Sequence, residues 1–389
     1  VFELYDTFGF PVDLTALILS EKGFTLDEKG FEAELLKQKN RSRSASESAT
    51  DDWTILGDDT QAEFVGYDTL EASVNISKYR KTTSKKDGEM YQLAFNKTPF
   101  YPEGGGQVGD NGSIEDTDGN VTYIVDTKKE NNVIIHFTKK LPKNLNSTFK
   151  AVVDKNKRSK TACNHTATHL LHQALREILG THVAQKGSAV NAKYLRFDFS
   201  HFSKLTAEEL TKVEDFVNSK IANNIALNER RNIPMQQAID EGAMALFGEK
   251  YGDTVRAIKF GNSVELCGGT HVNQTGDIGL FKIVSEAGIA SGVRRIEAVT
   301  GEQAIAYVQS QQDTLQSLSA LLKSDPTNLK DRVASLQNQT KELEKALNSA
   351  KQKLASQQVA DMLSNVVEIN DTKVLVAKLE GVEAKSLRP

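Results

Sequence analysis

The sequence predicts an α+β protein of several domains: a helical lead, a small antiparallel β-barrel, an α+β core and an antiparallel coiled-coil hairpin. Three observations predict this fold class. The length of 389 residues exceeds one ordinary domain. The first half of the chain contains short apolar runs separated by Gly, Asn and Asp, which is typical of antiparallel strands. The C-terminal part carries a heptad pattern, which is typical of paired helices.

Composition favours a soluble globular protein. Hydrophobic residues make up 39% of the chain and charged residues 26%, and no run approaches the roughly 18 apolar residues of a membrane span. Two cysteines, Cys163 and Cys267, are too few for a disulfide framework, and no signal peptide is visible. We therefore expect a cytoplasmic protein without membrane contact. Because the chain lacks an initial Met and ends on KSLRP, we also expect a fragment of a longer protein.

Residues 1–52 are predicted to be helical. Pro11 suits the first turn of a helix, and Gly23 suits the end of the same helix. Thr25 and Glu28 have the spacing of a capping box ahead of a second helix. The polar tract NRSRSASESATDD then predicts a frayed helix end or a linker.

Residues 53–150 are predicted to form a small antiparallel β-barrel or sandwich. Runs such as EASVNISKY and NNVIIHFTK have strand length and are separated by turn residues. The same region contains PFYPEGGGQVGDNG, with three consecutive glycines. Glycines let a backbone approach a ligand closely, but a long hairpin turn would use the same residues, so the sequence leaves both interpretations open.

A positive excess lies across the end of this region. Residues 128–160 hold ten Lys or Arg residues against two acidic residues, whereas the whole chain has a formal net charge of -4. Such a stretch is either a solvated face or a surface that meets a phosphate backbone.

Residues 151–300 are predicted to form an α+β core. HTATHLLHQALREILG has the pattern of an amphipathic helix ended by Gly180, and KYLRFDFSH alternates like a strand. TAEELTKVEDFVNSKIANN predicts another helix, in which Thr206 and Glu209 have capping-box spacing.

Residues 301–365 are predicted to form an antiparallel coiled-coil hairpin. The second helix carries apolar and small residues at alternating steps of four and three, namely Leu329, Val333, Leu336, Thr340, Leu343, Leu347, Ala350 and Leu354. A shorter stripe precedes the turn SDPTN. Residues 366–389 are predicted to begin a further, truncated domain, with a strand in TKVLVAKLEGVEA.

Four side chains of metal-binding type stand in two distant places. His165 and His169 are four residues apart in a helical pattern, so both imidazoles project from one face. Cys267 and His271 flank the residues GGT, whose glycines free the backbone so that both side chains can converge. Imidazole and thiolate ligands favour zinc over magnesium or calcium. Spacing leaves open whether the site is closed and structural or admits water and substrate.

Small polar side chains near these ligands suit a hydrolytic pocket: Thr168, Gln185 and Ser188. Each of them alone is also typical of a turn or a surface. We predict packing, not metal binding, for Cys163 and His172. The remaining histidines are predicted to be structural and satisfied by hydrogen bonds: His136, His182 and His201.

Several of these motifs together resemble one family. HTATHLLHQAL, THVAQKGS, RFDF and CGGTH resemble the editing domain of alanyl-tRNA synthetases, which is similar to free-standing AlaX proteins and to the second additional domain of threonyl-tRNA synthetases. LYDTFGFPVDLT resembles the end of the tRNA-recognition region, and YPEGGGQVGD resembles the glycine-rich loop of the editing barrel. The resemblance assigns residues 1–52 to tRNA recognition, 53–150 to the editing barrel, 151–300 to the zinc-binding editing core, 301–365 to the hairpin and 366–389 to the start of the C-terminal domain.

The resemblance implies hydrolysis of mischarged Ser-tRNA(Ala) and Gly-tRNA(Ala). One Zn²⁺ ion per chain would be held by His165, His169, Cys267 and His271, and Thr168, Gln185 and Ser188 would line the pocket that separates serine from alanine. The aminoacylation core, with its ATP and Mg²⁺, would precede Val1 and be missing. The alternative is a tRNA-binding module in which the zinc is purely structural.

The resemblance also implies contacts with the acceptor stem of tRNA(Ala). The residues expected to make them are Asp6, with Asp13 as an alternative, and Glu103, Gly105, Gln107, Lys157 and Arg158. In this family the C-terminal domain contributes to dimerisation. Because only its start is present, we expect this fragment to be a monomer, with a homodimer possible for the full-length protein.

Overall fold

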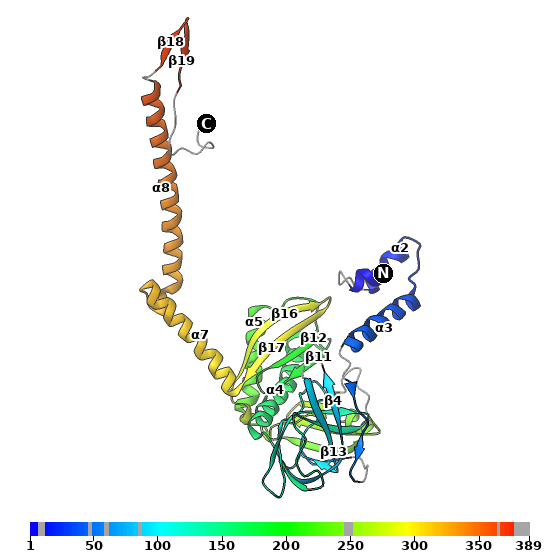
Figure 1. Ribbon diagram of the computed structural model, residues 1–389. Helices are drawn as coiled ribbons and strands as arrows, with labels where there is room; N and C mark the ends of the chain where they lie inside the picture. Colours follow the sequence, from blue (N-terminus) through cyan, green and yellow to red (C-terminus); the bar gives the residue numbers. More distant parts are fainter. Residues whose placement is uncertain are drawn as a thin grey trace. The chain divides into compact units, whose positions relative to one another are not determined.

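The computed structural model describes residues 1–6, 12–45, 49–57, 62–84, 88–244, 252–363 and 366–376. These residues belong to two units, Val1–Ala306 and Tyr307–Pro389, and each is described by itself (Figure 1). Within the described part of the chain, no helix combines the length and the apolar character needed to cross a membrane.

The N-terminal residues are helical, as predicted. The helices are α1 (Phe2–Asp6), α2 (Val12–Glu21) and α3 (Glu28–Ala45). Gly23 follows α2 with φ of 78°, a left-handed conformation that ends a helix without strain. The predicted capping role of Thr25 is wrong, because Asp27 Oδ1 accepts the Gly30 N–H of the first turn of α3 at 2.9 Å. Pro11 lies outside the described residues.

The next part of the chain forms a closed antiparallel sheet, as predicted. Its strands follow one another in the order β4, β10, β7, β8, β9, β5, and β5 also pairs with β4, so the ring closes. Their bounds are β4 (Glu71–Ser84), β5 (Gly88–Phe95), β7 (Gly112–Glu115), β8 (Val121–Glu130), β9 (Val133–Thr138) and β10 (Thr148–Val153). Two short strands pair with β4, namely β1 (Ala49–Thr50) and β2 (Thr54–Ile55), and β3 (Glu63–Phe64) and β6 (Lys97–Thr98) form a separate parallel pair.

Alternation along the strands creates the barrel interior. In β10, Phe149, Ala151 and Val153 are buried, while Thr148 and Lys150 face outward. Side chains that alternate in this way direct one apolar row inward and one polar row to solvent. The barrel core consists of Val74, Ile76, Leu93, Phe95, Phe100, Ile114, Ile124, Phe149, Ala151 and Val153.

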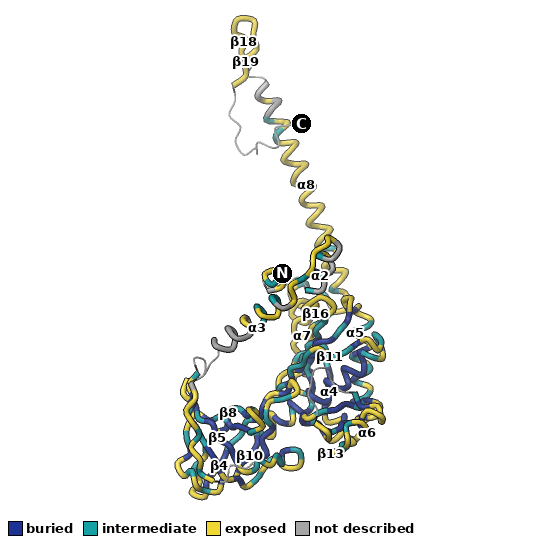
Figure 2. Tube along the Cα trace, turned by 90° about the vertical axis from the view of Figure 1, so that its right-hand side faces the viewer, coloured by how far each residue is buried: buried dark blue, intermediate teal, exposed yellow. Residues whose placement is uncertain are grey.

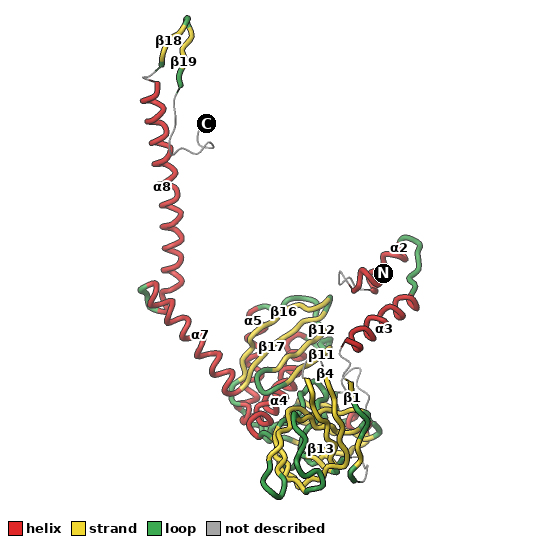
Figure 3. Tube along the Cα trace, viewed as in Figure 1, coloured by secondary structure: helices red, strands yellow, loops and turns green. Residues whose placement is uncertain are grey.

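The chain from α4 to β17 forms the α+β core. A four-stranded antiparallel sheet has the order β11, β12, β17, β16, and a three-stranded sheet has the order β13, β14, β15 (Figure 3). The helices are α4 (Lys155–Leu179), α5 (Ala207–Ala222), α6 (Met235–Asp240) and the 3₁₀ helix η1 (Thr275–Ile278). The strands are β11 (Gln185–Val190), β12 (Leu195–Ser200), β13 (Asn228–Pro234), β14 (Thr254–Phe260), β15 (Ser263–Leu266), β16 (Phe281–Ala290) and β17 (Val293–Thr300).

Helix α4 is the centre of this core. Leu170, Leu171 and Leu175 are fully buried with Phe197 and Phe199 of β12 in one apolar cluster. Figure 2 shows α4 as a mostly buried helix and α8 as an exposed one. Helix α5 begins with the predicted capping box, in which Thr206 accepts from the Glu209 N–H and the Glu209 side chain accepts from the Thr206 N–H.

The C-terminal helices form where they were predicted, but their hairpin does not. The elements are α7 (Gly301–Leu322), the 3₁₀ helix η2 (Pro326–Asn328) and α8 (Leu329–Leu363). Heptad residues of α8 remain exposed, with 42% for Val333, 70% for Leu343 and 61% for Leu354. The apolar stripe of α7 is shorter than the seam of α8, so part of that seam has no matching stripe on α7. The predicted antiparallel hairpin is therefore wrong for this structure.

A β-hairpin of β18 (Val367–Ile369) and β19 (Thr372–Val374) follows α8. Asn370 and Asp371 form its turn with positive φ of 47° and 58°, as a two-residue hairpin turn requires. The predicted strand starts at Thr372, and its continuation past residue 376 lies outside the described residues.

Candidate metal centre

Helix α4 places His165 and His169 on one buried face. Asp154 fixes the start of the helix, because its Oδ1 accepts the Lys157 N–H at 3.1 Å. Gly180 ends it, and its N–H donates to Arg176 O. Each of the two imidazoles belongs to a residue that is only 4% exposed. The predicted helix is confirmed, and the two imidazoles are held inside the core.

The turn after β15 places Cys267 and His271 against this face. Gly269 lies so close to the His165 ring that any Cβ at this position would collide with it. The Gly269 N–H donates to Cys267 Sγ at 3.3 Å. Glycine at position 269 is therefore required for the turn to approach α4.

Two side chains outside the turn hold its carbonyl groups. Arg256 donates to Cys267 O at 2.9 Å and to Gly269 O at 2.6 Å. Tyr67 donates its hydroxyl to Gly268 O at 2.5 Å. The Arg256 guanidinium also lies 3.9 Å from the centre of the Tyr67 ring, a cation–π contact. Neither residue was identified from the sequence, because the partners of a backbone turn carry no motif.

The four predicted ligand side chains converge on one point. One ligand atom from each of His165, His169, Cys267 and His271 lies within 4.8 Å of the others. Cys267 Sγ is 3.4 Å from His165 Nε2 and 3.3 Å from His271 Nε2. Zinc bonds of about 2.3 Å to sulfur and about 2.0 Å to nitrogen, at a tetrahedral angle, place such atoms roughly 3.5 Å apart. The donor set and its spacing therefore fit a tetrahedral metal ion.

The electrostatic environment keeps the histidines neutral. Burial lowers the pKa of His165 and of His271 well below the ordinary value, and the neighbouring histidines and Arg256 lower both pKa values further. The pKa of His169 is lowered chiefly by burial as well. Metals bind the neutral imidazole, so these groups need no deprotonation to accept one at neutral pH.

Two of the imidazole rings are oriented by polar neighbours on their far side. His165 Nδ1 lies 2.7 Å from Gln107 Oε1. His271 Nδ1 lies 3.0 Å from Thr166 Oγ1. Each contact leaves the Nε2 atom of the ring facing Cys267, which is how outer partners fix the orientation of metal ligands. Thr166 was missed at the sequence level because it reads as one more polar residue of a helix.

A buried carboxylate, Glu265, stands beside the ligand group. It is 2% exposed, and its Oε2 lies 3.5 Å from His169 Nε2. Its Oε1 lies 3.0 Å from His172 Nδ1, and His172 packs on Phe197 and stays outside the ligand group, as predicted. Glu265 was missed, although it precedes Cys267 by two residues, a spacing that directs two extended residues to the same face.

The predicted pocket residues lie on α4 and β11. Gln185 and Ser188 are half-buried on β11, and Gln185 Nε2 approaches Ser188 Oγ at 3.4 Å. Thr168 is buried on α4, where its hydroxyl donates to Asn164 O at 2.8 Å, a bond within its own helix. The structure thus brings Gln185 and Ser188 together, and the substrate role of all three residues stays a prediction.

The residues predicted to contact RNA differ in how far they are exposed to solvent. The side chains of Glu103 and Lys157 are 55% and 57% exposed. Gly105 has φ of 55° at the tip of the glycine loop. Gln107 is 0% exposed, and Arg158 is 6% exposed. Direct RNA contact is wrong for these two residues, because both are enclosed by protein groups.

Arg158 forms a buried ion pair with Asp110. Its Nε donates to Asp110 Oδ2 at 2.8 Å, and its other nitrogens donate to Gly66 O at 2.7 Å and Pro99 O at 2.9 Å. For Asp6, the structure gives only its place as the last residue of α1. Asp13 lies in α2.

Three further histidines and Cys163 behave as predicted. His136 is fully buried between Thr98 and Leu93 O, and His201 lies between His182 and Ser203. Cys163 packs against the apolar core, and burial raises the pKa of its thiol to about 11. None of these residues joins the metal-binding group.

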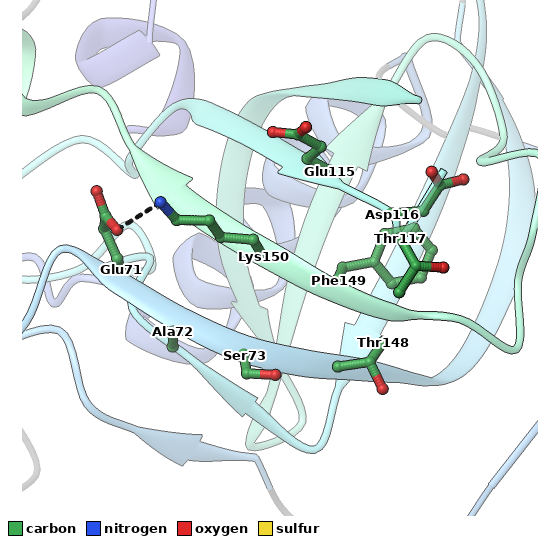
Figure 4. Close-up of a pocket in the computed structure, with 9 residues that line it drawn as sticks. All are labelled: Glu71, Ala72, Ser73, Glu115, Asp116, Thr117, Thr148, Phe149 and Lys150. Atoms are coloured by element: carbon green, nitrogen blue, oxygen red, sulfur yellow. Dashed lines mark ion pairs between the residues drawn. The ribbon is translucent and has the colours of Figure 1, made fainter. Parts of the chain in front are cut away.

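A cavity of about 500 Å³ borders the metal centre. His271 and Thr270 form one side of it, and Tyr67, Lys155 and Arg256 contribute polar groups elsewhere. A separate groove lies on the barrel between β4, β7 and β10, where Lys150 and Glu71 pair at 2.9 Å (Figure 4). No predicted ligand or pocket residue lines that groove, whereas His271 of the predicted ligand set lines the cavity.

Two family models match the chain. Residues 1–157 match the family described as tRNA synthetases class II (A). Residues 255–297 match the family described as the threonyl and alanyl tRNA synthetase second additional domain. The second match contains Cys267 and His271.

Curated relatives match nearly the whole chain. The alanine–tRNA ligase of Christiangramia forsetii is 58% identical over 379 residues, which are 97% of this chain and 43% of that protein. Those of Flavobacterium psychrophilum and Cytophaga hutchinsonii are 51% and 52% identical, and 97% of this chain is covered in each comparison. The chain spans less than half the length of these relatives.

Proposed function

The chain belongs to the alanine–tRNA ligase family, and from this premise we propose that it carries the editing activity of such an enzyme. The activity is zinc-dependent hydrolysis of the ester in seryl-tRNA(Ala) and glycyl-tRNA(Ala). The observation that carries the proposal is the convergence of His165, His169, Cys267 and His271, with ligand atoms within 4.8 Å, from two places 102 residues apart in sequence.

Zinc is the proposed ion because the donor set is three imidazoles and one thiolate. When bound, it would polarise the ester carbonyl or a water molecule. The protein's own contribution is orientation and enclosure, since all four ligands are held by buried helix and turn contacts. We place ligation of alanine, with ATP and Mg²⁺, in the part of the relatives that this chain does not span.

Selectivity for the seryl ester is proposed to rest on hydrogen bonds. Gln185 and Ser188 of β11 would supply an amide and a hydroxyl, and Thr168 of α4 would supply a second hydroxyl. A site that bonds to the serine hydroxyl favours serine over alanine, whereas a purely apolar pocket discriminates poorly between them. The tRNA itself would meet exposed groups such as Lys157, in the cytoplasm, where we place the protein.

The test is deacylation by the purified chain. Ser-tRNA(Ala), Gly-tRNA(Ala) and Ala-tRNA(Ala) are incubated with zinc-loaded protein, and the loss of each ester is followed over time. We expect the seryl and glycyl esters to disappear faster than the alanyl ester. Equal rates for all three esters would contradict the proposal.

Two matched cysteine variants separate catalysis from mere RNA binding. Cys267→Ala should lose bound zinc and deacylation together, whereas Cys163→Ala should keep both. If Cys267→Ala loses zinc but deacylates like wild type, the ion is structural and the chain is a tRNA-binding module whose hydrolysis has another source.

A further inference from the structure

We propose that Gln107 is a positioning residue of the metal centre, which the barrel contributes to the core. The inference rests on the proposed metal binding and deepens it. Gln107 was expected to contact tRNA, but its side chain is fully buried and faces two parts of the ligand set.

The backbone holds Gln107 in a tight glycine turn. Gly104 and Gln107 exchange two main-chain hydrogen bonds of 3.1 and 2.9 Å. Gly105 and Gly106 between them have φ of 55° and 79°, which only glycine adopts easily. The turn is therefore rigid, and it directs the glutamine side chain inward.

The same turn is attached to the edge of the core sheet. Val190 N–H of β11 donates to Gly106 O at 2.7 Å, and Val108 N–H donates to Val190 O at 3.0 Å. Gly106 also passes so close to Ser188 that a Cβ would collide with it. The barrel loop and the core thus form one structure at the position of Gln107.

The contacts of the Gln107 amide define its orientation. Its Oε1 faces the Thr270 N–H at 2.9 Å and His165 Nδ1 at 2.7 Å. A backbone N–H is only a donor, so the atom that faces it must be the amide oxygen. The same oxygen cannot donate to His165, so Nδ1 must carry the proton. The proton-free Nε2 of His165 then faces Cys267 Sγ at 3.4 Å, in the tautomer that a metal requires.

One side chain thereby fixes both halves of the ligand set. His165 stands on α4, and Thr270 stands between Cys267 and His271 in the turn after β15. Gln107 Nε2 adds a bond of 2.9 Å to Thr270 Oγ1, so neither end of the amide is free to turn. Loss of such an outer partner typically weakens metal binding about 10–100-fold.

The test compares variants of the whole chain at position 107. Zinc affinity is measured by competition with a chromophoric chelator, and the ligand field is measured from the visible spectrum of the cobalt-substituted protein. Gln107→Leu, which keeps the volume but removes both polar ends, should weaken zinc binding about 10–100-fold and shift the cobalt spectrum. Gln107→Glu should stay near wild type, because its carboxylate still accepts from His165 and from the Thr270 N–H.

Gln92→Leu is the matched control. Gln92 is another buried glutamine of the barrel, and its Oε1 accepts from Arg80 Nε and not from a residue of the ligand group. Its loss should leave zinc affinity unchanged. If Leu at position 107 prevents folding of the metal-free chain, Gln107→Asn replaces it, since the shortened amide withdraws from both partners.

The outcomes separate this inference from the proposed function. Wild-type zinc affinity in Gln107→Leu, or equal losses in Gln107→Leu and Gln107→Glu, would overturn the positioning role while the metal centre stands. A wild-type chain that binds no zinc would refute the metal centre itself, and the role of Gln107 with it.

Discussion

At the scale of single residues, two histidines of the metal-binding group, His165 and His271, depend on neighbours that bind no metal. His271 is the clearest case besides His165, because Thr166 Oγ1 faces its Nδ1 at 3.0 Å and also accepts the Val272 N–H at 3.2 Å. The hydroxyl therefore ties the imidazole and the backbone of the ligand turn to α4. Orientation of the ligands is a property of these second contacts as much as of the ligands themselves.

Thr166→Val should weaken zinc binding about 10-fold, because valine keeps the shape of threonine but cannot accept from His271. Thr168→Val is the matched control on the same helix, since the Thr168 hydroxyl donates only to Asn164 O of its own helix. Its zinc affinity should equal that of wild type. The measurement is chelator competition on both variants, and equal affinities for the two would contradict the assigned role of Thr166.

His136 should make folding sensitive to acid. Burial lowers its pKa from the ordinary 6.5 to about 3, so between these values the unfolded chain binds more protons than the folded chain. The free energy of unfolding therefore rises with pH in this window. Acidification from about pH 7 to about pH 5 should remove about 2 kcal/mol through this residue alone.

Denaturant unfolding of the metal-free chain at both pH values measures this term. His136→Gln cannot gain the proton, so it should lose about 2 kcal/mol less than wild type on acidification. The other buried histidines contribute equally to the pH dependence of both proteins, so their contributions cancel when the variant is compared with wild type. An identical pH dependence would show that His136 is not the group responsible.

The sequence predicted the ligands better than their partners for a physical reason. His165 and His169 are linked by helical periodicity, and the glycines between Cys267 and His271 signal a turn. Gln107 and His165 are 58 residues apart, and Thr166 and His271 are 105 apart. Their meeting depends on how barrel, helix and turn pack, and no local pattern encodes that.

At the scale of elements, the glycine loop and α4 are joined by a buried ion pair. Arg158, in the first turn of α4, pairs with Asp110, three residues beyond Gln107, and both side chains are 6% exposed. Arg158 also donates to Gly66 O and Pro99 O, and Asp110 accepts the Tyr101 N–H at 2.7 Å. The pair thus sets the loop that carries Gln107 against the helix that carries His165.

Arg158→Met should lower the free energy of unfolding by about 3–5 kcal/mol, because it leaves the Asp110 carboxylate buried without its cation. Denaturant titration measures the change. Lys157→Met, one residue earlier and 57% exposed, should change stability by less than about 0.5 kcal/mol. If the two variants unfold alike, the pair does not hold these elements together.

The periodicity of apolar residues predicted most helices and strands. The features that it did not predict depend on how these elements pack together. The strands around the barrel alternate inward and outward, as β10 shows, so the sequence predicted them. Closure of the ring depends on pairing between β4 and β5, two strands that follow one another in the sequence. The prediction of a hairpin between α7 and α8 was wrong because a heptad seam indicates that a helix has a partner but not which segment is that partner.

At the scale of the molecule, burial ends early in α7. Ala304 is fully buried, and Lys160 pairs with Glu302 at 2.8 Å. Among the described residues from Tyr307 onward, none is buried. Every residue described above as contacting the metal-binding group precedes position 307.

A chain that ends at Ala306 should therefore keep the folded metal centre. We expect one zinc ion per chain and a thermal midpoint within about 2 °C of the full chain, because none of the described residues that are removed is buried. A chain that ends at Thr300 is the matched control: it loses Ala304, the Lys160–Glu302 pair and the Gly301 N–H bond to Leu280 O at 2.8 Å. Its midpoint should fall by several degrees, roughly 4 °C or less per kcal/mol lost in a chain of this size. Calorimetry and metal analysis of the three chains decide the matter, and loss of zinc from the chain ending at Ala306 would show that the C-terminal helices support the centre.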